Sequence, residues 1–414
     1  MNMMNRKMIL RKQFKTALIA GAMSLTALAF GACGNNTSDS TSTSSQTAGT
    51  SYSSALAAST NFTERDLEQS ADTTDAVNVT LNDGEVYTIS DAGVYVLSGS
   101  YTDTTIVVDA DDSDKVQLVV DGLTITNSNL PAVLVKNADK VFVTTTDAGA
   151  ELTVVDKYSS YDDIDTDAVI YSKADLVLNG TGTLKIVSEY GNGISTKDDF
   201  KMTGGTLDIE CKLDAVEAHD SIAICDGDIT IKASKDGLHS EDSDDDTVGS
   251  IYISGGTFNI DVDGDAIQAT TTLVIDGGNI NIANCGEGLE STYVEINDGT
   301  ISINASDDGI NASDKSSSCN VVIKINGGTI TINMGQGDTD AIDSNGDLYI
   351  NGGTIDITAN SPFDYDGTGE LNGGDVTTNG TSVTELTNQM MGGGGMGGPG
   401  GQMSGRGGNR GGMR

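Results

Sequence analysis

The sequence predicts an all-β fold, a right-handed parallel β-helix in which coils of about 21–22 residues stack into a solenoid, with insertions in some coils. A glycine followed by Thr, Asn or Asp and an alternating apolar run recurs at spacings of 21 to 29 residues. β-Branched residues dominate these runs, and 52 Gly against only 3 Pro suits short strands joined by turns. The repeated glycines are Gly182, Gly205, Gly227, Gly256, Gly278, Gly299, Gly328, Gly353 and Gly374.

Each repeat contains two short strands around a glycine turn. In Val322–Ile332, the residues Ile323 and Ile325 before the Gly pair, and Ile330 and Ile332 after it, share one face. These apolar side chains can be buried only when neighbouring coils stack on them. The strand periodicity argues against a leucine-rich repeat, which needs a helical segment.

The N-terminus has the features of an export signal. Basic residues precede a short apolar run and the small residues before Cys33, as in a bacterial lipoprotein signal, so we expect residues 1–33 to be removed or processed and Cys33 to be lipidated. Ordinary secretion is the alternative. Residues 34–60, rich in Ser and Thr, are predicted to be a solvated tether. The expected location is extracellular, at the cell surface, with the lipid anchor as the sole membrane contact.

Residues 61–385 are predicted to form the β-helix, and residues 386–414, rich in Gly and Met, a disordered tail. Residues 63–69 begin like a helix and could close the open end of the solenoid. Residues 76–170 are expected to form less regular coils of the same solenoid. Their strand candidates are Val77–Leu81, Val94–Leu97, Ile106–Val108, Val116–Val120, Leu123–Thr126, Ala132–Val135, Val141–Thr144 and Leu152–Val155. Two polar insertions, Ser240–Ser250 and Ser313–Asn320, interrupt the later repeats.

The charge excludes nucleic acid as a partner and favours cations. The net formal charge is −39, and the segment between Lys15 and Arg406 holds all 61 acidic residues against 14 basic ones. Phosphate backbones and anionic lipid headgroups would be repelled by this body. We therefore expect bound cations. We also expect the protein to be a monomer.

A second motif occurs once per coil: an acidic residue or Asn, Gly or Ala, an apolar residue, a variable residue and a small one. The apolar and small residues must point inward, so the variable residues point outward and stack about 4.8 Å apart. Ser195 begins this outward row. The predicted carbohydrate-binding residues in it are Glu217, His239, Gln268, Glu290, Asn311 and Asp343.

The acidic residues of the same motif form a second stacked row. Unit charges at that spacing repel by about 1 kcal/mol in water and about 3.5 kcal/mol at an effective dielectric of 20. Calcium ions between coils would relieve the repulsion, because Ca²⁺ prefers carboxylate and carbonyl oxygens. The alternative is that the Asp-Gly pairs only form turns. The predicted Ca²⁺ ligands are Asp214, Asp236, Asp265, Glu287, Asp307, Asp308 and Asp340.

Several motifs resemble one family in both sequence and order. They are Asp91–Gly99, Val119–Asn127, Ser172–Leu176, the Gly-Gly-Thr units, Gly286–Glu290, Ser306–Ala312 and Asp364–Gly367. Over roughly 75–375 the chain resembles clostridial surface lipoproteins with a parallel β-helix carbohydrate-binding domain, related in architecture to pectate lyases. The resemblance implies calcium-assisted binding of an acidic plant cell-wall polysaccharide such as polygalacturonate, without cleavage. Such proteins often carry Lys or Arg directly after the acidic–Ala/Gly–apolar motif of the second coil. At that position this chain has Glu217–Asp220.

Three function classes remain open: a non-catalytic glycan-binding module, a polysaccharide lyase or hydrolase, and a structural adhesin or stalk. Lysines in the coils are the candidate lyase bases, since Arg65 is the one arginine between Lys15 and Arg406. Paired acids such as Asp307 and Asp308 are candidates for hydrolysis. The two histidines, at 219 and 239, lack a defined third metal ligand. The four cysteines after Cys33 match no zinc spacing, and their disulfide state stays open.

Overall fold

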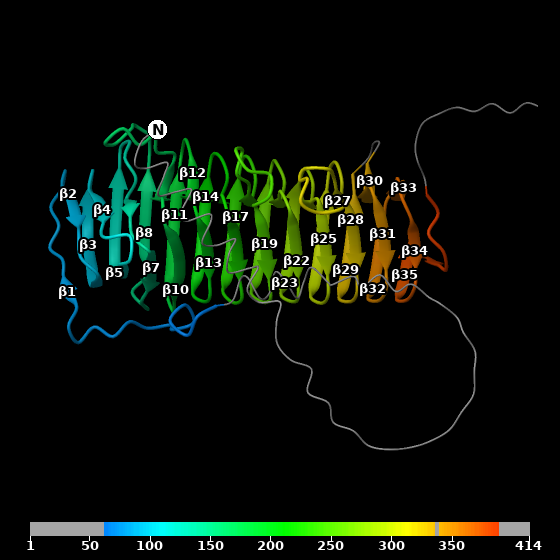
Figure 1. Ribbon diagram of the computed structural model, residues 1–414, viewed down its shortest axis with the longest axis horizontal. Coiled ribbons are helices and arrows are strands. Elements are labelled where there is room, and N and C mark those ends of the chain that lie inside the picture. The colour runs from blue at the N-terminus through cyan, green and yellow to red at the C-terminus, as the bar shows by residue number, and fades with distance from the viewer. Residues whose placement is uncertain (1–61, 336–338, 389–414) are drawn as a thin grey trace, which may run out of the picture. The chain divides into compact units, whose positions relative to one another are not determined.

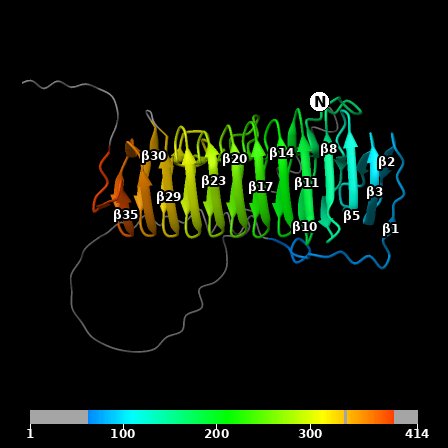
Figure 2. The same ribbon diagram turned by 180° about the vertical axis from the view of Figure 1, so that it is seen from behind.

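The computed structural model describes residues 62–335 and 339–388, and all the regular elements in these ranges are β-strands. Strands of successive coils pair in parallel, so the coils stack along one axis (Figures 1 and 2). The prediction of an all-β parallel solenoid is therefore confirmed. Within the described ranges, the structure contains no helix of the length and hydrophobicity that a membrane crossing requires.

Each coil contributes one strand to each of three faces. The first face consists of twelve short strands. They are β2 (Val86–Ile89), β4 (Thr105–Asp109), β6 (Val133–Asn137), β9 (Ala168–Ser172), β12 (Asn192–Thr196), β15 (Val216–Ala218), β18 (Leu238–Ser240), β21 (Ile267–Ala269), β24 (Leu289–Ser291), β27 (Ile310–Ala312), β30 (Asp340–Ser344) and β33 (Ser361–Tyr365).

The second and third faces are joined by two long strands, β3 (Gly93–Thr102) and β5 (Lys115–Asn127), each of which runs through both. The second face also holds β1 (Val77–Asn78), β7 (Lys140–Thr145), β10 (Asp175–Gly180), β13 (Asp199–Met202), β16 (Ser221–Ile224), β19 (Ser250–Ile253), β22 (Thr272–Ile275), β25 (Tyr293–Ile296), β28 (Val322–Ile325), β31 (Asp347–Ile350) and β34 (Gly369–Leu371). The third face holds β8 (Ala150–Val154), β11 (Thr183–Ser188), β14 (Thr206–Cys211), β17 (Asp228–Ala233), β20 (Thr257–Val262), β23 (Asn279–Cys285), β26 (Thr300–Ala305), β29 (Thr329–Met334), β32 (Thr354–Thr358) and β35 (Asp375–Thr378), with β36 (Thr381–Val383) added antiparallel to β35.

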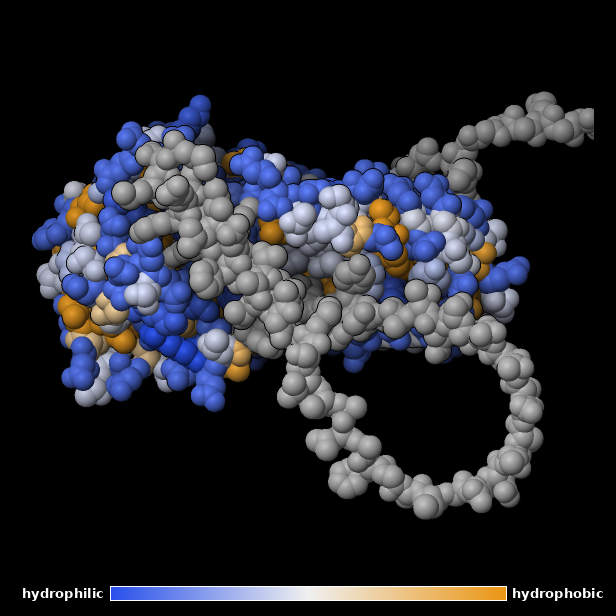
Figure 3. All heavy atoms as spheres, in the orientation of Figure 1, coloured by the Kyte–Doolittle hydropathy of each residue, from blue (hydrophilic) through white to orange (hydrophobic). Residues whose placement is uncertain are grey.

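One apolar core runs through the stacked coils. In β17 the residues Ile229 and Ile231 are buried, while Thr230 and Lys232 between and after them are exposed. The same alternation buries the four isoleucines predicted to share a face in Val322–Ile332. Outside the core, hydrophilic residues cover most of the described surface visible in Figure 3. The buried side chains of all three faces therefore meet in one interior, as the repeat required.

The repeated glycines turn the chain between the second and third faces. Eight of the nine predicted positions have positive φ, from 79° at Gly205 to 125° at Gly227. The exception is Gly182, where Gly180 takes the positive φ of 117° two residues earlier. A positive φ favours glycine because a Cβ would clash with the backbone. The recurrence of glycine once per coil is therefore explained by the positive φ that this turn requires.

Residues 76–170 belong to the same solenoid, as predicted, because β5, β7 and β10 pair in register across the boundary. All the predicted strands of this stretch are present, and two of them, Val116–Val120 and Leu123–Thr126, are merged in β5. Strand β2 was missed. The signal segment with Cys33, the 34–60 tether and the tail from residue 389 lie outside the described residues.

The expectation of a capping helix at 63–69 is wrong. Thr63 and Asp66 do exchange the reciprocal hydrogen bonds of a helix start, but only a turn forms. Asp66 is fully buried against the second face, with its carboxylate 3.2 Å from Lys140 Nζ and 3.9 Å from Lys201 Nζ. These buried ion pairs hold the segment on the side of the coils near β10 and β13 (Figure 1), away from the open end.

The four cysteines that the structure describes are free thiols, and Cys211 faces the core. The two polar insertions contact each other above the first face: Ser316 Oγ donates to Asp246 O at 2.5 Å, and Ser317 N donates to Asp246 Oδ2 at 3.0 Å. Segments 70 residues apart in sequence therefore form one structural feature beside β21 and β24.

Candidate functional site

The variable residues of the repeated motif stack on the outer side of the first face, as predicted. The Cα register joins Ser195, Glu217, His239, Gln268, Glu290, Asn311 and Asp343 in consecutive coils. We call these seven residues the polar row. Their neighbours face inward: Val216 and Ala218, on either side of Glu217, are fully buried. Asp364 continues the row by one coil, because it pairs with Asp343.

The polar row does not extend over the whole first face. The equivalent positions in the earlier coils are Val107, Leu134 and Tyr171, which form a small apolar cluster on the outside of the sheet. Tyr161 and Ile164, from the loop before β9, cover this cluster. The polar part of the face therefore begins at β12.

The acidic residues of the motif form a second row beside the polar row. We call Asp214, Asp236, Asp265, Glu287, Asp308 and Asp340 the carboxylate row. Oδ1 of an aspartate accepts the backbone N–H of the next member: Asp214 from Asp236 at 3.0 Å, Asp236 from Asp265 at 2.9 Å, Asp265 from Glu287 at 3.1 Å, and Asp308 from Asp340 at 3.0 Å. The turn-forming interpretation is therefore correct for one oxygen of these aspartates. The second oxygen of these aspartates takes no part in this ladder and meets other side chains in Asp214, Asp236 and Asp265.

Three groups of described residues place ligand atoms within 4.8 Å of one another, as a metal site requires. Two of them combine the carboxylate row with the polar row: Asp214 with Asp236 and His239, and Asp265 with Glu287 and Glu290. We call these the first and second clusters. The third, Asp175 with Asp198 and Asp199, lies where the first face turns into the second and was not predicted. Asp307, Asp308 and Asp340 belong to none of the three, and Asp307 is exposed, so their role as Ca²⁺ ligands stays a prediction.

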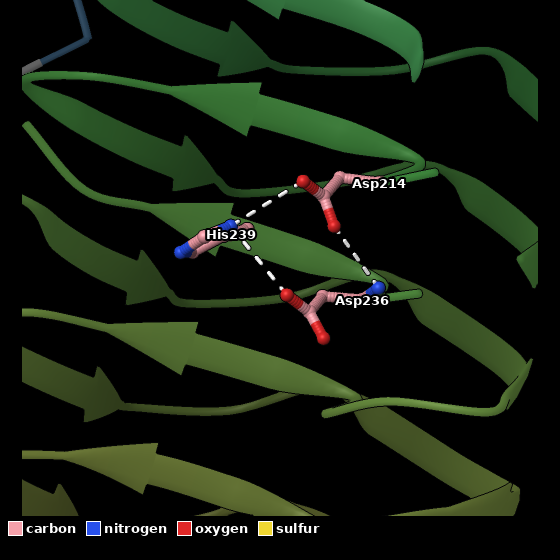
Figure 4. Close-up of side chains that lie close together, drawn as sticks. All are labelled: Asp214, Asp236 and His239. Carbon is pink, nitrogen blue, oxygen red and sulfur yellow. Dashed lines mark hydrogen bonds and ion pairs between the residues drawn. The ribbon is translucent and has the colours of Figure 1, made fainter. Parts of the chain in front are cut away.

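The first cluster already contains positive charge (Figure 4). The Nδ1 atom of His239 lies 3.5 Å from Oδ2 of both Asp214 and Asp236. Lys235 Nζ lies 2.8 Å from Asp214 Oδ2 and 3.6 Å from Asp236 Oδ2. On the other side of the ring, His239 Nε2 is 3.0 Å from Glu241 Oε2. The carboxylates therefore have partners within the protein.

The titration of the first cluster reflects these partners. Burial opposes ionisation of Asp214, but His239 and Lys235 together lower the pKa of its carboxyl group below the ordinary value. Burial also opposes the charging of His239, and Asp214 and Asp236 raise its pKa above the ordinary value nonetheless. Asp236 differs, because burial and the charge of Asp214 raise the pKa of its carboxyl group. Asp214 and His239 thus favour their charged forms without any added cation.

The second cluster is two coils further on and has a different set of neighbours. Gln268 Nε2 lies between two carboxylates, 2.6 Å from Asp265 Oδ2 and 2.5 Å from Glu290 Oε2. Asn311 Nδ2 donates to Glu287 Oε2 at 2.9 Å. Burial, with Glu290 adding its negative charge, raises the pKa of Glu287 to about 8. The same two causes raise the pKa of Asp265.

The insertion at 313–320 supplies the one ammonium that contacts the second cluster among the described residues. Lys315 Nζ lies 2.8 Å from Glu290 Oε2, and Ser313 Oγ donates to Glu290 Oε1 at 3.0 Å. This insertion was predicted from the sequence, but its contact with Glu290 was not. The repeat predicts the position of a residue only from the equivalent residue in the next coil. An insertion has no equivalent residue, so the repeat did not predict which residues it contacts.

The second cluster has the donor set of a hard cation. Asp265, Glu287 and Glu290 offer carboxylate oxygens within 4.8 Å of one another, and the amide of Asn311 contacts Glu287. Asn311 is only 7% exposed, and its Oδ1 has no hydrogen-bond partner among the described residues. A buried, unsatisfied carbonyl oxygen is costly unless a ligand meets it. Oxygen atoms of this kind are those that Ca²⁺ takes.

Beyond the second cluster the row remains acidic. Burial and the neighbouring carboxylates raise the pKa of Asp308 to about 6 and that of Asp343 to about 7. Asp364 Oδ1 is buried without a hydrogen-bond partner in the described residues. Carboxylates therefore recur in the last coils of this face, at Asp308, Asp343 and Asp364.

The sequence resembles known proteins over much of its length. A family model described as carbohydrate-binding domain-containing protein matches residues 83–339 and 288–385. A protein of that description from Acetivibrio thermocellus is 34% identical over 125 residues, which are 30% of this chain and 44% of the relative, so this chain spans less than half of the relative's length.

A solved structure, that of a polysaccharide lyase-like protein from C. thermocellum in a gadolinium derivative, is 25% identical. The match covers 75% of this chain and 91% of that one, with a TM-score of 0.32. At that TM-score the likeness supports no conclusion about this chain. The family match does, because it extends over well more than half of the sequence: the chain belongs to the family of carbohydrate-binding domain-containing proteins.

Proposed function

We propose that this protein binds an acidic polysaccharide of the polygalacturonate type along the polar row, in a calcium-dependent manner and without cleaving it. The observation that carries the proposal is the second cluster, where three carboxylates lie within 4.8 Å of one another beside Asn311, a buried amide that donates to Glu287 and whose Oδ1 has no partner among the described residues. Membership of the family supports a glycan as the ligand. The stacked row supports an extended one, since the same type of position recurs in every coil.

A divalent cation is needed because the protein and the proposed ligand have the same sign of charge. The chain carries a net formal charge of −39, so a polyuronate would be repelled by most of its surface. A Ca²⁺ ion held by Asp265, Glu287 and Glu290 would offset that charge and leave coordination positions for a sugar carboxylate. When bound, the ion supplies an electrostatic bridge, and the protein residues position it.

The lysines that were candidate lyase bases support binding more than catalysis. Lys235 is 2.8 Å from Asp214, and although burial opposes its charge, Asp214 raises its pKa. Lys232 forms an exposed pair with Glu210 at 3.2 Å. A lysine base requires a lowered pKa. Lys173 is the lysine with that property, through burial and the charge of Lys136, and it keeps lyase chemistry as the second candidate function.

We further propose that the protein acts outside the cell as a monomer, held to the membrane by a lipid on Cys33. The basis is the signal-like sequence around Cys33 and the Ser/Thr-rich stretch after it. Metabolic labelling with a fatty acid tests the anchor, and Cys33→Ala is the matched control. Label that persists in the variant would rule out Cys33 as the modified residue.

The function is tested by calorimetric titration of the purified protein with polygalacturonate oligomers, first in Ca²⁺ and then in EDTA. The absorbance of unsaturated products is followed in the same samples. Heat that requires Ca²⁺ and occurs without product supports the proposal. Product formation makes the protein a lyase. Heat in neither condition supports a structural stalk.

A further inference from the structure

Four basic side chains stack on the outer side of the first face, two residues after the polar row. Val135, Ser172, Thr196 and Ala218 are in register, so the residues that follow them, Lys136, Lys173, Lys197 and His219, occupy one position in four successive coils. We call these four residues the basic row. It runs beside the polar row on the flank opposite to the carboxylate row.

The basic row differs from other lysines of this protein, which form ion pairs with carboxylates of a neighbouring coil. Lys115, Lys185 and Lys232 each meet a carboxylate of an adjacent coil, at 2.7, 2.8 and 3.2 Å. In the basic row, basic residues stack on basic residues. Equivalent positions lie about 4.8 Å apart in such a stack, so these charges repel each other.

Within the basic row, the charge is least compensated at Lys173. Lys136 is paired with Asp109 at 3.0 Å and Asp162 at 3.1 Å. The backbone N–H of Lys173 donates to Val135 O at 3.0 Å, but its half-buried ammonium forms no hydrogen bond or ion pair with any residue that the structure describes. An ammonium that is partly desolvated and unpaired is unfavourable, and more so because so many acidic residues are available in this chain.

The next two members of the row face each other. Lys197 Nζ lies 3.0 Å from His219 Nε2 and 5.7 Å from the centre of the Tyr171 ring. Burial and Lys197 lower the pKa of His219, so the ring stays neutral and accepts from the ammonium. Glu217 and Asp167 act on this pair from the side of the polar row. Lys173 and Lys197 thus occupy adjacent coils at the start of the polar row, where the hydroxyl of Ser195 donates to Glu217 at 3.0 Å.

We propose that Lys173 and Lys197 form an anion subsite that binds a carboxylate of the acidic polysaccharide directly, without calcium. This inference rests on the proposed function and names a second point of contact for the same glycan. Lys197 and Asp265 are three coils apart, about 14 Å at 4.8 Å per coil. One chain along the polar row would therefore meet ammonium groups at one end and calcium-bound carboxylates at the other.

The subsite explains how an acidic protein selects an acidic glycan. In the register of the basic row, the later coils carry Glu241, Thr270, Thr292, Ser313, Asn345 and Asp366, so the basic residues are followed along the axis by neutral and acidic ones only. A glycan without carboxylates would gain nothing from the basic end. Charge-assisted hydrogen bonds from ammonium to carboxylate are the stronger class of hydrogen bond.

The test compares Lys173→Gln/Lys197→Gln with Lys185→Gln, a matched control on the third face. Calorimetry with polygalacturonate oligomers in Ca²⁺ should show at least a tenfold loss of affinity for the double variant, a loss of less than twofold for the control, and partial recovery in Lys173→Arg/Lys197→Arg. Thermal melting monitors folding. Wild-type affinity in the double variant would overturn the subsite and leave the proposed function intact.

A second measurement is independent of the polysaccharide. Galacturonate and galactose are titrated into the protein in EDTA while the side-chain signals of Lys173 and Lys197 are followed by NMR. We expect the signals to shift with galacturonate and to stay with galactose. If the oligomers fail to bind but galacturonate shifts both lysines, the subsite stands and the proposed function fails. If neither lysine responds, the subsite is overturned.

Discussion

The first and second clusters come from the same motif in the same stack, yet they differ in charge. In the first, Lys235 precedes Asp236 and His239 occupies the polar row. In the second, the position of Lys235 is taken by Gly264, and that of His239 by Gln268 and then Glu290. The first cluster therefore contains two basic residues of its own repeat, whereas the three carboxylates of the second meet one ammonium, that of Lys315 from an insertion. The proposed calcium site therefore depends on the neighbours of the acidic residues more than on the acidic residues themselves.

The largest effect is expected from removing the charge of the second cluster. Asp265→Asn/Glu290→Gln should weaken Ca²⁺ binding by about a hundredfold, because affinity follows the number of charged ligands. At a Ca²⁺ concentration of a hundred times Kd, the wild type gains about 2.7 kcal/mol of stability, and the variant should lose most of this gain. Thermal melting in Ca²⁺ and EDTA measures it.

The matched control is Asp214→Asn in the first cluster. An asparagine keeps the Oδ1 that accepts the N–H of Asp236, so the ladder of the carboxylate row is preserved. This variant should retain the full response to Ca²⁺. A loss of that response equal to the loss in the double variant would show that the two clusters do not differ as we describe.

The stability of the calcium-free protein should fall as the pH rises from about 4.5 to about 8. Glu287 has an ordinary pKa of 4.5, and burial with the charge of Glu290 raises it to about 8. Between these values the folded state holds a proton that the unfolded chain has released, so raising the pH favours unfolding. Asp308 and Asp343 act in the same direction.

Calcium should reduce this pH dependence, because a bound cation stabilises the ionised carboxylates. Melting temperatures measured between pH 4.5 and 8 in EDTA and in Ca²⁺ check it, with Glu287→Gln as the variant that loses part of the slope. A melting temperature in EDTA that rises through this window would contradict the charge assigned to the second cluster.

A smaller effect is expected from making the first cluster resemble the second. Lys235→Met/His239→Gln removes both cations from Asp214 and Asp236, and should create one additional, weaker Ca²⁺ site. Calorimetry would show the stoichiometry increase by one. An unchanged stoichiometry would mean that carboxylates without cations do not suffice for an ion in this stack.

The smallest effect separates the two histidines by titration. The chain contains only two, so each ring gives its own NMR signal. We expect His239 to titrate above 6.5 and His219 below it, because Asp214 and Asp236 act on the first and Lys197 on the second. His239 therefore stabilises the fold below pH 6.5, and that contribution is lost as the pH rises through its raised pKa. The reverse order of titration would contradict both environments.

The local rules of strand and turn were visible in the sequence. Period-2 alternation placed Ile229 and Ile231 inward, and it made Glu217 and His239 outward neighbours in the stack, as the register shows. Even the turn-forming role of Asp214 was among the alternatives. Contacts made by segments outside the repeat were not visible in the sequence. Lys315 contacts Glu290 of the polar row from an insertion, and the Thr63–Asp66 turn packs on the second face.

By itself the sequence determined the coil, the residues that face inward and the composition of the polar row, because these depend on near neighbours and on a repeat that returns to the same place every turn. Only the tertiary structure decided which acids lack a counter-ion and which lysines stack on one another. Those properties depend on contacts between coils and across insertions, where distance in sequence says nothing about distance in space. Electrostatic interactions depend on distance in space. For this reason the raised pKa of Glu287 and the unpaired ammonium of Lys173 could be recognised only in the folded chain.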